Sequence, residues 1–223
     1  MKTYALIPAY NEEKTIEKVV KKVKKMNLTP IVVDDFSSDN TYELAKRAGA
    51  IVLKHEKNKG KGEAIKTGFE FLKKNDFDHV VLIDADMQYS PEEAIKLLTP
   101  LKEGKADFVV GYRNWKNIPF RHKLGNFVWR NSFNILFGTK FKDTNCGFMA
   151  LNKKAVKKIK NIGGGYIIEN QLFVEALKNK LKIEQVPVSV NYKNKSGILR
   201  GVRVVLGVLF FILREGLKYR IKR

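Results

Sequence analysis

The chain has 223 residues and carries 43 Lys and Arg against 23 Asp and Glu, which gives a formal net charge of +20 at pH 7. Hydrophobic residues make up 44% and charged residues 30%, a composition typical of a folded globular protein that excludes a disordered tail or a collagen. The single cysteine excludes an internal disulfide and a cysteine-based zinc site, and the excess of positive charge predicts an anionic partner.

The first hundred residues alternate between short apolar runs and amphipathic stretches with helical spacing. The pattern predicts strands at residues 4–7, 31–34, 51–53, 79–83 and 107–110, and helices that begin near residues 16, 40, 63 and 91. Strands that alternate with helices form a mostly parallel, doubly wound α/β sheet flanked by helices. Ligands of such sheets bind beyond the carboxyl ends of the strands.

The second half of the chain is less regular. Its pattern predicts a helix at residues 124–137, a strand at 147–151, a helix at 169–178 and a weakly alternating stretch at 183–192. We interpret this half as a second part of the same domain, on the side where a second ligand would bind. The domain then extends over residues 1–197.

Residues 198–223 combine an apolar run with a basic end, since they hold seven Lys and Arg and one Glu. The run from Val204 to Leu213 is ten residues long, well short of the ~18–20 apolar residues that span a bilayer. We therefore predict an amphipathic helix at an anionic membrane surface. The alternative is a helix packed on the body of the protein, with cations near its C-terminus.

Polar residues follow three of the predicted strands, at residues 8–12, 34–39 and 84–88. Because carboxyl ends of parallel strands share one edge of a sheet, we expect these three segments to meet in one crevice. Asp84 and Asp86 are the sharpest feature, because two carboxylates one residue apart after an apolar strand repel each other unless a cation binds them. Mg²⁺ or Mn²⁺ fits such a pair, and Gln88 adds a neutral oxygen ligand. The alternative is a strand end with solvated or helix-capping aspartates.

Two further segments carry candidate anion contacts. Residues 58–64 hold a Gly-Lys-Gly sequence that opens a helix, and both glycine backbones and helix starts favour anions. Arg113 follows the fifth strand and Arg121 comes soon after. Because they are expected near the same edge as the metal site, they are candidates for binding a further phosphate group of a ligand. The alternatives are a plain lysine-rich loop and a basic surface loop.

These motifs, in this order, resemble family 2 glycosyltransferases of the GT-A fold, in the subgroup of dolichyl-phosphate mannose and polyprenyl-phosphate glucose synthases. The resemblance covers residues 3–197, and its specificity lies in the whole set. The matching segments are residues 7–12, Asp34-Asp35, Gly60-Lys61-Gly62 with Ala64, Asp84-Ala85-Asp86 with Gln88, Gly111-Tyr112-Arg113, Arg121 with Leu124-Gly125-Asn126, Phe137-Gly138, Asp143-Thr144, Cys146-Gly147-Phe148 and Glu169.

The resemblance implies metal-dependent, inverting transfer of a hexose from GDP-mannose or a UDP-sugar to dolichyl or polyprenyl phosphate. The implied nucleotide-binding residues are Pro8, Ala9, Tyr10, Glu12, Asp35, Lys61, Gly62 and Asp84. The implied metal ligands for Mg²⁺ or Mn²⁺ are Asp84, Asp86 and Gln88, and the implied catalytic residues are Asp86, Arg113, Arg121 and Glu169. In this scheme Arg113 and Arg121 bind the lipid phosphate, assisted by Lys195 and Ser196, while Glu169 lies near the acceptor.

The sequence departs from the subgroup at two places. Met149 stands where arginine is frequent, and Asn170-Gln171 replaces a more acidic pair. Many relatives continue into two or four transmembrane helices, and no such segment is expected here. We therefore expect a cytoplasmic protein, peripheral on the inner face of the cell membrane, that meets its lipid through residues 198–223 or through a separate membrane subunit.

Two alternatives come from other classes. A sugar nucleotidyltransferase also combines a doubly wound sheet with acidic metal ligands, but it usually carries a glycine- and arginine-rich loop where this chain has residues 8–12. A nucleic-acid-binding module is suggested by charge alone. No aromatic-rich RNA motif accompanies the charge, so nucleic acid is not an expected partner.

Overall fold

The computed structural model describes the backbone of residues 1–113, 120–163, 167–191 and 198–221, and the side chains of these residues except 120–125 and 198–206. Seven described strands form one sheet with the order β3-β2-β1-β4-β6-β5-β7. The strands are β1 (Thr3–Ala9), β2 (Thr29–Asp34), β3 (Ile51–Lys54), β4 (His79–Leu82), β5 (Phe108–Arg113), β6 (Met149–Asn152) and β7 (Ile183–Val188). All pairings are parallel except those of β6, which confirms the doubly wound, mostly parallel sheet.

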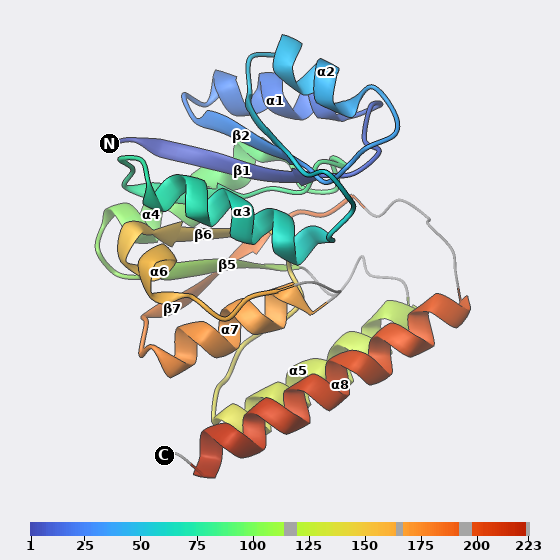
Figure 1. Ribbon diagram of the computed structural model, residues 1–223. Coiled ribbons are helices and arrows are strands. Elements are labelled where there is room, and N and C mark those ends of the chain that lie inside the picture. Colours follow the sequence, from blue (N-terminus) through green and yellow to red (C-terminus); the bar gives the residue numbers. More distant parts are fainter. Residues whose placement is uncertain (114–119, 164–166, 192–197, 222–223) are drawn as a thin grey trace.

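Helices cover both faces of this sheet (Figure 1). They are α1 (Ile16–Lys25), α2 (Thr41–Arg47), α3 (Lys61–Lys73), α4 (Ala94–Lys102), α5 (Phe120–Phe137), α6 (Lys153–Lys158), α7 (Ile168–Lys178) and α8 (Ile198–Ile221), with a 3₁₀ turn at Pro91–Glu93. The pattern in the sequence predicts all of them except the six-residue α6. Asn152 caps α6 by accepting a hydrogen bond from the backbone N–H of Ala155 at 2.9 Å.

The antiparallel strand β6 lies between β4 and β5, with Met149 opposite Leu82 and also opposite Val110. Since β6 runs against its neighbours, it starts at the edge where they end. The residues before it, which we name the 143–148 loop, therefore lie at the carboxyl edge, beside the ends of β4 and β5. A segment distant in sequence thus joins the crevice that the strand ends form.

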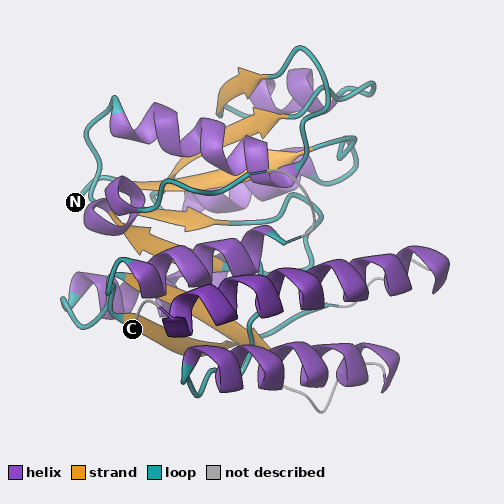
Figure 2. Cartoon of the chain, turned by 60° about the horizontal axis from the view of Figure 1, so that its bottom comes forward, coloured by secondary structure: helices purple, strands orange, loops and turns teal. Residues whose placement is uncertain are grey.

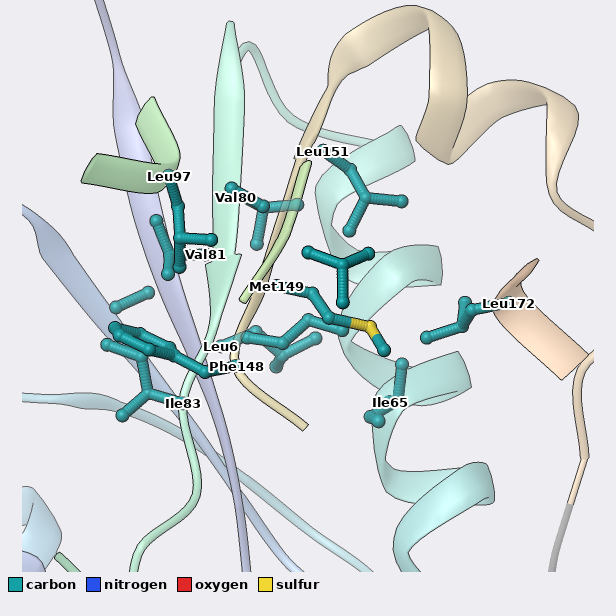
Figure 3. Packing of buried hydrophobic residues seen from close by; sticks show 14 of the residues in the cluster. Leu6, Ile65, Val80, Val81, Ile83, Leu97, Phe148, Met149, Leu151 and Leu172 are labelled. Atoms are coloured by element: carbon teal, nitrogen blue, oxygen red, sulfur yellow. The ribbon is translucent and has the colours of Figure 1, made fainter. Parts of the chain in front are cut away.

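Alternation along the strands divides the core into two layers. Figure 3 shows Leu97 of α4 near Val81 on one side of the sheet and Ile65 of α3 on the other. Helix α3 approaches the sheet closely at Gly68, where a Cβ atom would stand 2.2 Å and 2.5 Å from the two methyl carbons of Leu6. Leu6 is fully buried, so the absence of a side chain at Gly68 lets α3 lie directly on β1.

Helices α5 and α8 lie side by side, outside the layers that cover the sheet (Figures 1 and 2). They run in the same direction, because Tyr219 near the end of α8 packs on Phe137 at the end of α5 with ring centroids 5.2 Å apart. The guanidinium of Arg220 donates to the carbonyl of Leu136 at 3.1 Å, and Lys178 of α7 pairs with Glu215 at 2.9 Å. Among the described residues, no helix has the length and apolar character needed to cross a bilayer.

The packing at Gly68 leads to a first prediction. Gly68→Ala adds a methyl group against Leu6, and overpacking of a core costs about 1–3 kcal/mol, whereas Ala in place of Gly in a helix gains about 0.5–1 kcal/mol. We expect a net loss in the free energy of unfolding, measured by urea denaturation, and a smaller loss in the background of Leu6→Val.

Gly207→Ala in α8 is the matched control, because nothing lies within 4 Å of the added Cβ. This control should gain the helix-propensity term of about 0.5–1 kcal/mol. If Gly68→Ala stabilised the protein as the control does, the close contact between α3 and β1 would be wrong.

Candidate active site

The three predicted strand ends meet at the carboxyl edge of the sheet in a pocket of about 290 Å³. Its lining residues are Pro8, Ala9, Tyr10, Glu12, Asp35, Lys61, Ala64, Asp84, Ala85 and Asp86. Every residue proposed to bind the nucleotide is among them except Gly62, which is buried in the first turn of α3. The sequence therefore predicts the position and most of the lining of this pocket.

Asp35 holds the segment that leads into α3. Its carboxylate accepts hydrogen bonds from the backbone N–H groups of Lys59 at 2.9 Å and Gly60 at 2.7 Å, and Gly60 has a φ of 87° that favours glycine. His55 Nδ1 lies 2.6 Å from the same carboxylate, and its Nε2 lies 2.9 Å from the hydroxyl of Thr67. No pattern in the sequence pairs His55 with Asp35, since 20 residues separate them.

Lys61, the first residue of α3, bridges two carboxylates. Its Nζ lies 2.7 Å from Oδ1 of Asp84, after β4, and 2.9 Å from Oε1 of Glu169, in the first turn of α7. Burial alone would lower the pKa of the Lys61 ammonium, but the charges of Asp84 and Glu169 and the hydrogen bonds to them outweigh burial and raise that pKa. The Lys61 side chain therefore stays protonated and carries a positive charge at the edge of the pocket.

Gly147 of the 143–148 loop lies directly against this bridge. A Cβ atom at Gly147 would stand 2.8 Å from Oδ2 of Asp84, 3.0 Å from Nζ of Lys61 and 3.4 Å from Oε1 of Glu169. The loop backbone can approach the three charged groups only because this residue has no side chain. The motif match in the sequence includes Gly147, but only the structure gives the reason for a glycine here.

Asp86 and Gln88 form the other part of the predicted metal site. Oδ1 of Asp86 accepts a hydrogen bond from the backbone N–H of Gln88 at 3.0 Å, and the Gln88 amide also donates to the Asp86 carboxylate. The intervening Met87 has a φ of 61°, so the backbone turns sharply between the two side chains. No three His, Cys, Asp or Glu side chains of the described residues form a group that could hold a metal ion.

The charges of the lining show whether a divalent cation fits. The lining contains four carboxylates, those of Glu12, Asp35, Asp84 and Asp86, and one ammonium, that of Lys61. A diphosphate would be repelled by this lining unless more positive charge accompanied it. Carboxylate and amide oxygens are the ligands that Mg²⁺ and Mn²⁺ prefer, and a cation already stands beside Asp84 in the form of Lys61. The residues therefore fit a divalent metal.

Arg113 is buried at the end of β5 and forms a two-pronged pair with Asp143. Its Nε lies 2.7 Å from Oδ2 and its Nη2 lies 3.0 Å from Oδ1 of that carboxylate. Burial alone would lower the pKa of the guanidinium, but the charge of Asp143 outweighs burial and raises it. In this structure Arg113 thus holds the 143–148 loop, an interaction that the sequence did not predict. The side chain of Arg121, and residues Lys195 and Ser196, lie outside the described part of the chain.

A chain of amides connects the loop to α5 and α7. Asn170 donates to the side-chain oxygen of Asn145 at 2.8 Å, and Asn145 donates to Asn126 at 3.4 Å. Asn170 is therefore used in packing at the position where the subgroup has an acidic residue. Cys146 is fully buried and burial raises the pKa of its thiol to about 12, so its thiol packs in the core as a neutral group.

Gly147 provides the second prediction. Gly147→Ala should leave the fold intact, because the atoms in its way are the ends of side chains, but it should displace Asp84 and Lys61. We expect calorimetry to show that uridine or guanosine diphosphate binds at least about tenfold more weakly, as sub-ångström displacement of a binding group costs factors of this order.

Gly163→Ala is the control, since its added Cβ would have only an ordinary contact of 3.5 Å with Glu63. Equal nucleotide affinity of Gly147→Ala and the unchanged protein would contradict the role of the close approach.

Comparison with proteins of known structure shows the fold. Glucosyl-3-phosphoglycerate synthase from Mycobacterium tuberculosis superposes with a TM-score of 0.80 at 23% identity, over 96% of this chain and 78% of that chain.

Two named relatives are more similar in sequence. The UDP-N-acetylglucosamine–dolichyl-phosphate N-acetylglucosaminyltransferase of Methanococcus voltae is 33% identical over 93% of this chain and 92% of its own length. The dolichol-phosphate mannosyltransferase of Pyrococcus furiosus is 30% identical over 81% of this chain and 54% of its own length.

Residues 4–160 match the model of the glycosyl transferase family 2, a segment that contains the whole pocket lining. The match favours sugar transfer over the nucleotidyltransferase alternative, whose phosphate loop this chain lacks. The chain therefore belongs to glycosyl transferase family 2 and is a glycosyltransferase of the GT-A fold.

Proposed function

We propose that this glycosyltransferase moves a hexose from a nucleotide diphosphate sugar to a polyprenyl or dolichyl phosphate, with inversion at the anomeric carbon. The observation that carries the proposal is the pocket in which residues 8–12, Asp35, Lys61 and the Asp84–Asp86 pair meet. The activities for which the two relatives are named support a phosphorylated polyprenol as the acceptor.

The donor is GDP-mannose or a UDP-sugar. Of the two named relatives, the more similar one takes its name from UDP-N-acetylglucosamine, so this donor is the first to test. In the pocket, Pro8, Ala9, Tyr10, Glu12 and Asp35 would surround the nucleoside. Gly62 would support this site from the first turn of α3.

Asp84, Asp86 and Gln88 would hold Mg²⁺ or Mn²⁺. The Mycobacterium tuberculosis enzyme was crystallised with Mn²⁺ and uridine diphosphate, which supports a divalent metal in this fold. When bound, the metal neutralises charge on the departing diphosphate. Lys61 adds a fixed positive charge at the same edge of the pocket.

The acceptor phosphate supplies the nucleophile. A phosphate monoester has a second pKa near ~6 and is largely ionised at neutral pH, so a strong general base is unnecessary. Arg113 and Arg121 would hold this phosphate in line with the anomeric carbon. Within the described part of the chain, the bonds from Arg113 to Asp143 use Nε and Nη2, so we assign the acceptor contact to Nη1. Glu169, which pairs with Lys61, would lie near the acceptor.

A third prediction tests the transfer. Each of UDP-N-acetylglucosamine, UDP-glucose and GDP-mannose, radiolabelled in the sugar, is incubated with a short polyprenyl phosphate, with and without Mn²⁺. We expect label in the lipid phase with one donor, in a metal-dependent manner. Asp86→Asn should reduce this transfer by at least about 10³-fold, because charge stabilisation of the leaving group is lost.

The fold of the variant is checked by circular dichroism. Asp76→Asn serves as control, because this carboxylate is exposed, lies outside the pocket lining and pairs with Lys153. Full activity of Asp86→Asn would contradict the metal assignment. Label transferred to phosphoglyceric acid, the compound bound in the Mycobacterium tuberculosis enzyme, would replace the lipid with a small acceptor.

The lipid acceptor requires contact with a membrane, and α8 has the surface for it. Its inner face buries Val208, Phe211 and Ile212, whereas its outer face exposes Phe210, Leu213, Leu217 and Ile221. The exposed apolar residues are spaced by three or four, so they form one stripe, and Arg214, Lys218 and Arg220 flank it. An apolar stripe between cations suits the interface of an anionic leaflet.

The neighbouring α5 also exposes apolar side chains, namely Phe127, Val128 and Ile135. Packing of α8 on α5 and α7 agrees with the alternative that a C-terminal helix covers the body, but it leaves the outer stripe available. We therefore propose that the protein is peripheral at a membrane surface. A separate membrane subunit would be an additional partner on the same stripe.

A fourth prediction follows for this stripe. Phe210→Ser with Leu213→Ser should weaken binding to vesicles that contain anionic lipid by at least about tenfold in a sedimentation assay, since each buried apolar side chain contributes about 1.5–3 kcal/mol when fully buried. Ile95→Ser is the control, because Ile95 is equally exposed but lies on α4. Unchanged vesicle binding of the double variant would refute the attachment.

A further inference from the structure

The ammonium of Lys61 lies beside Asp84, a residue that is proposed to bind the divalent metal. Its Nζ is 2.7 Å from Oδ1 of Asp84 and 2.9 Å from Oε1 of Glu169. The other Asp84 oxygen lies against the backbone of Gly147, where even a methyl group would stand 2.8 Å from it. One oxygen of the Asp84 carboxylate is thus paired with an ammonium, and the other lies close to the backbone of the 143–148 loop.

We infer that Lys61 is an internal counter-cation that a divalent metal must displace from Asp84, and that Glu169 is the positioning residue that keeps the displaced ammonium at the pocket. The inference rests on the proposed metal site. An ammonium at hydrogen-bond distance from a carboxylate oxygen and a divalent ion on the same oxygen repel each other strongly at such short range. The two cations therefore compete for Asp84.

Glu169 would hold the Lys61 ammonium after its displacement from Asp84. It is anchored in the first turn of α7, and it already shares Lys61 with Asp84. When Asp84 turns to the metal, Lys61 keeps Glu169 as a partner and remains beside the pocket with N–H groups released for a new acceptor. The ligand class that would take them is the diphosphate of the nucleotide, an anion that the carboxylates of the lining repel. Metal binding and diphosphate binding are then coupled through one side chain.

Binding of Mn²⁺ alone, followed by the electron paramagnetic resonance of the free ion, tests the displacement without any turnover. Lys61→Met removes the competitor, so Mn²⁺ should bind about tenfold more tightly, which corresponds to about 1.4 kcal/mol. The same variant should bind uridine or guanosine diphosphate more weakly in the presence of Mn²⁺, so the two ligands respond in opposite directions. Lys66→Met removes the same charge from the same helix, at a residue that pairs with Glu63, and should leave both affinities within about twofold.

Glu169→Gln provides the second arm of the test. Without Glu169, Lys61 has only Asp84 as its partner in the bridge, so Mn²⁺ should bind more weakly than to the unchanged protein. In the background of Lys61→Met, however, Glu169→Gln should have no effect on Mn²⁺ affinity, because Glu169 acts through Lys61. Equal weakening in both backgrounds would make Glu169 a direct ligand or a long-range charge and would overturn its positioning role.

An unchanged or weaker Mn²⁺ affinity of Lys61→Met would overturn the competition. Asp86→Asn separates this failure from a failure of the proposed function. If Asp86→Asn loses Mn²⁺ but Lys61→Met does not gain it, the metal site stands and the counter-cation inference falls. If Asp86→Asn binds Mn²⁺ as the unchanged protein does, with and without the nucleotide, the metal site itself is wrong and both proposals fall.

Discussion

The ammonium of Lys61, shared by Asp84 and Glu169, is the interaction on which the arrangement of the pocket depends. It connects the start of α3, the end of β4 and the start of α7, and Glu169 is 108 residues from Lys61 along the chain. These three segments are distant from one another in the sequence, and only their meeting at the carboxyl edge brings the charges together. The antiparallel course of β6 adds the fourth component, because it delivers Gly147 to the same point. A substitution that shifts any one of the four segments must therefore disturb the other three.

Charge is distributed unevenly between the pocket and the rest of the molecule. The chain carries a net charge of +20, and its lysines are placed on outer helix faces such as that of α1, which has five of them. The pocket lining, in contrast, has four carboxylates and one ammonium. A basic exterior increases the rate at which anionic molecules or an anionic surface are met, whereas an acidic lining holds a diphosphate only together with added positive charge. The basic exterior therefore acts when the protein first meets an anionic molecule or surface, and the acidic lining acts when the nucleotide binds in the pocket.

The sequence predicts the sheet and most of the pocket because the information is local. Strands 79–83 and 31–34 are apolar runs followed at once by carboxylates, so their ends and their chemistry are read from a few adjacent residues. The antiparallel insertion of β6 and the pair between Arg113 and Asp143 depend on contacts across 30 residues or more, and no periodicity encodes them. Arg113 shows the consequence. Its residue type correctly indicates an anionic partner, but within the described residues that partner is a carboxylate of the chain itself, and the acceptor phosphate is left to a proposal.

The placement of α5 and α8 links the proposed membrane contact to the chemistry. Strand β5 ends at Arg113, beside the 143–148 loop, and α5 begins at Phe120, while β7 ends at Val188 and α8 begins at Ile198. Both helices thus follow strands that end at the carboxyl edge, and both return along the body in the same direction until Tyr219 meets Phe137. A polyprenyl phosphate has its charge at one end of an apolar chain, so its tail must remain in lipid while its phosphate enters the pocket. Helices that follow strands ending at the carboxyl edge and that expose apolar side chains would satisfy both requirements with one structural unit, whereas an anchor elsewhere on the molecule would need a second element to guide the phosphate.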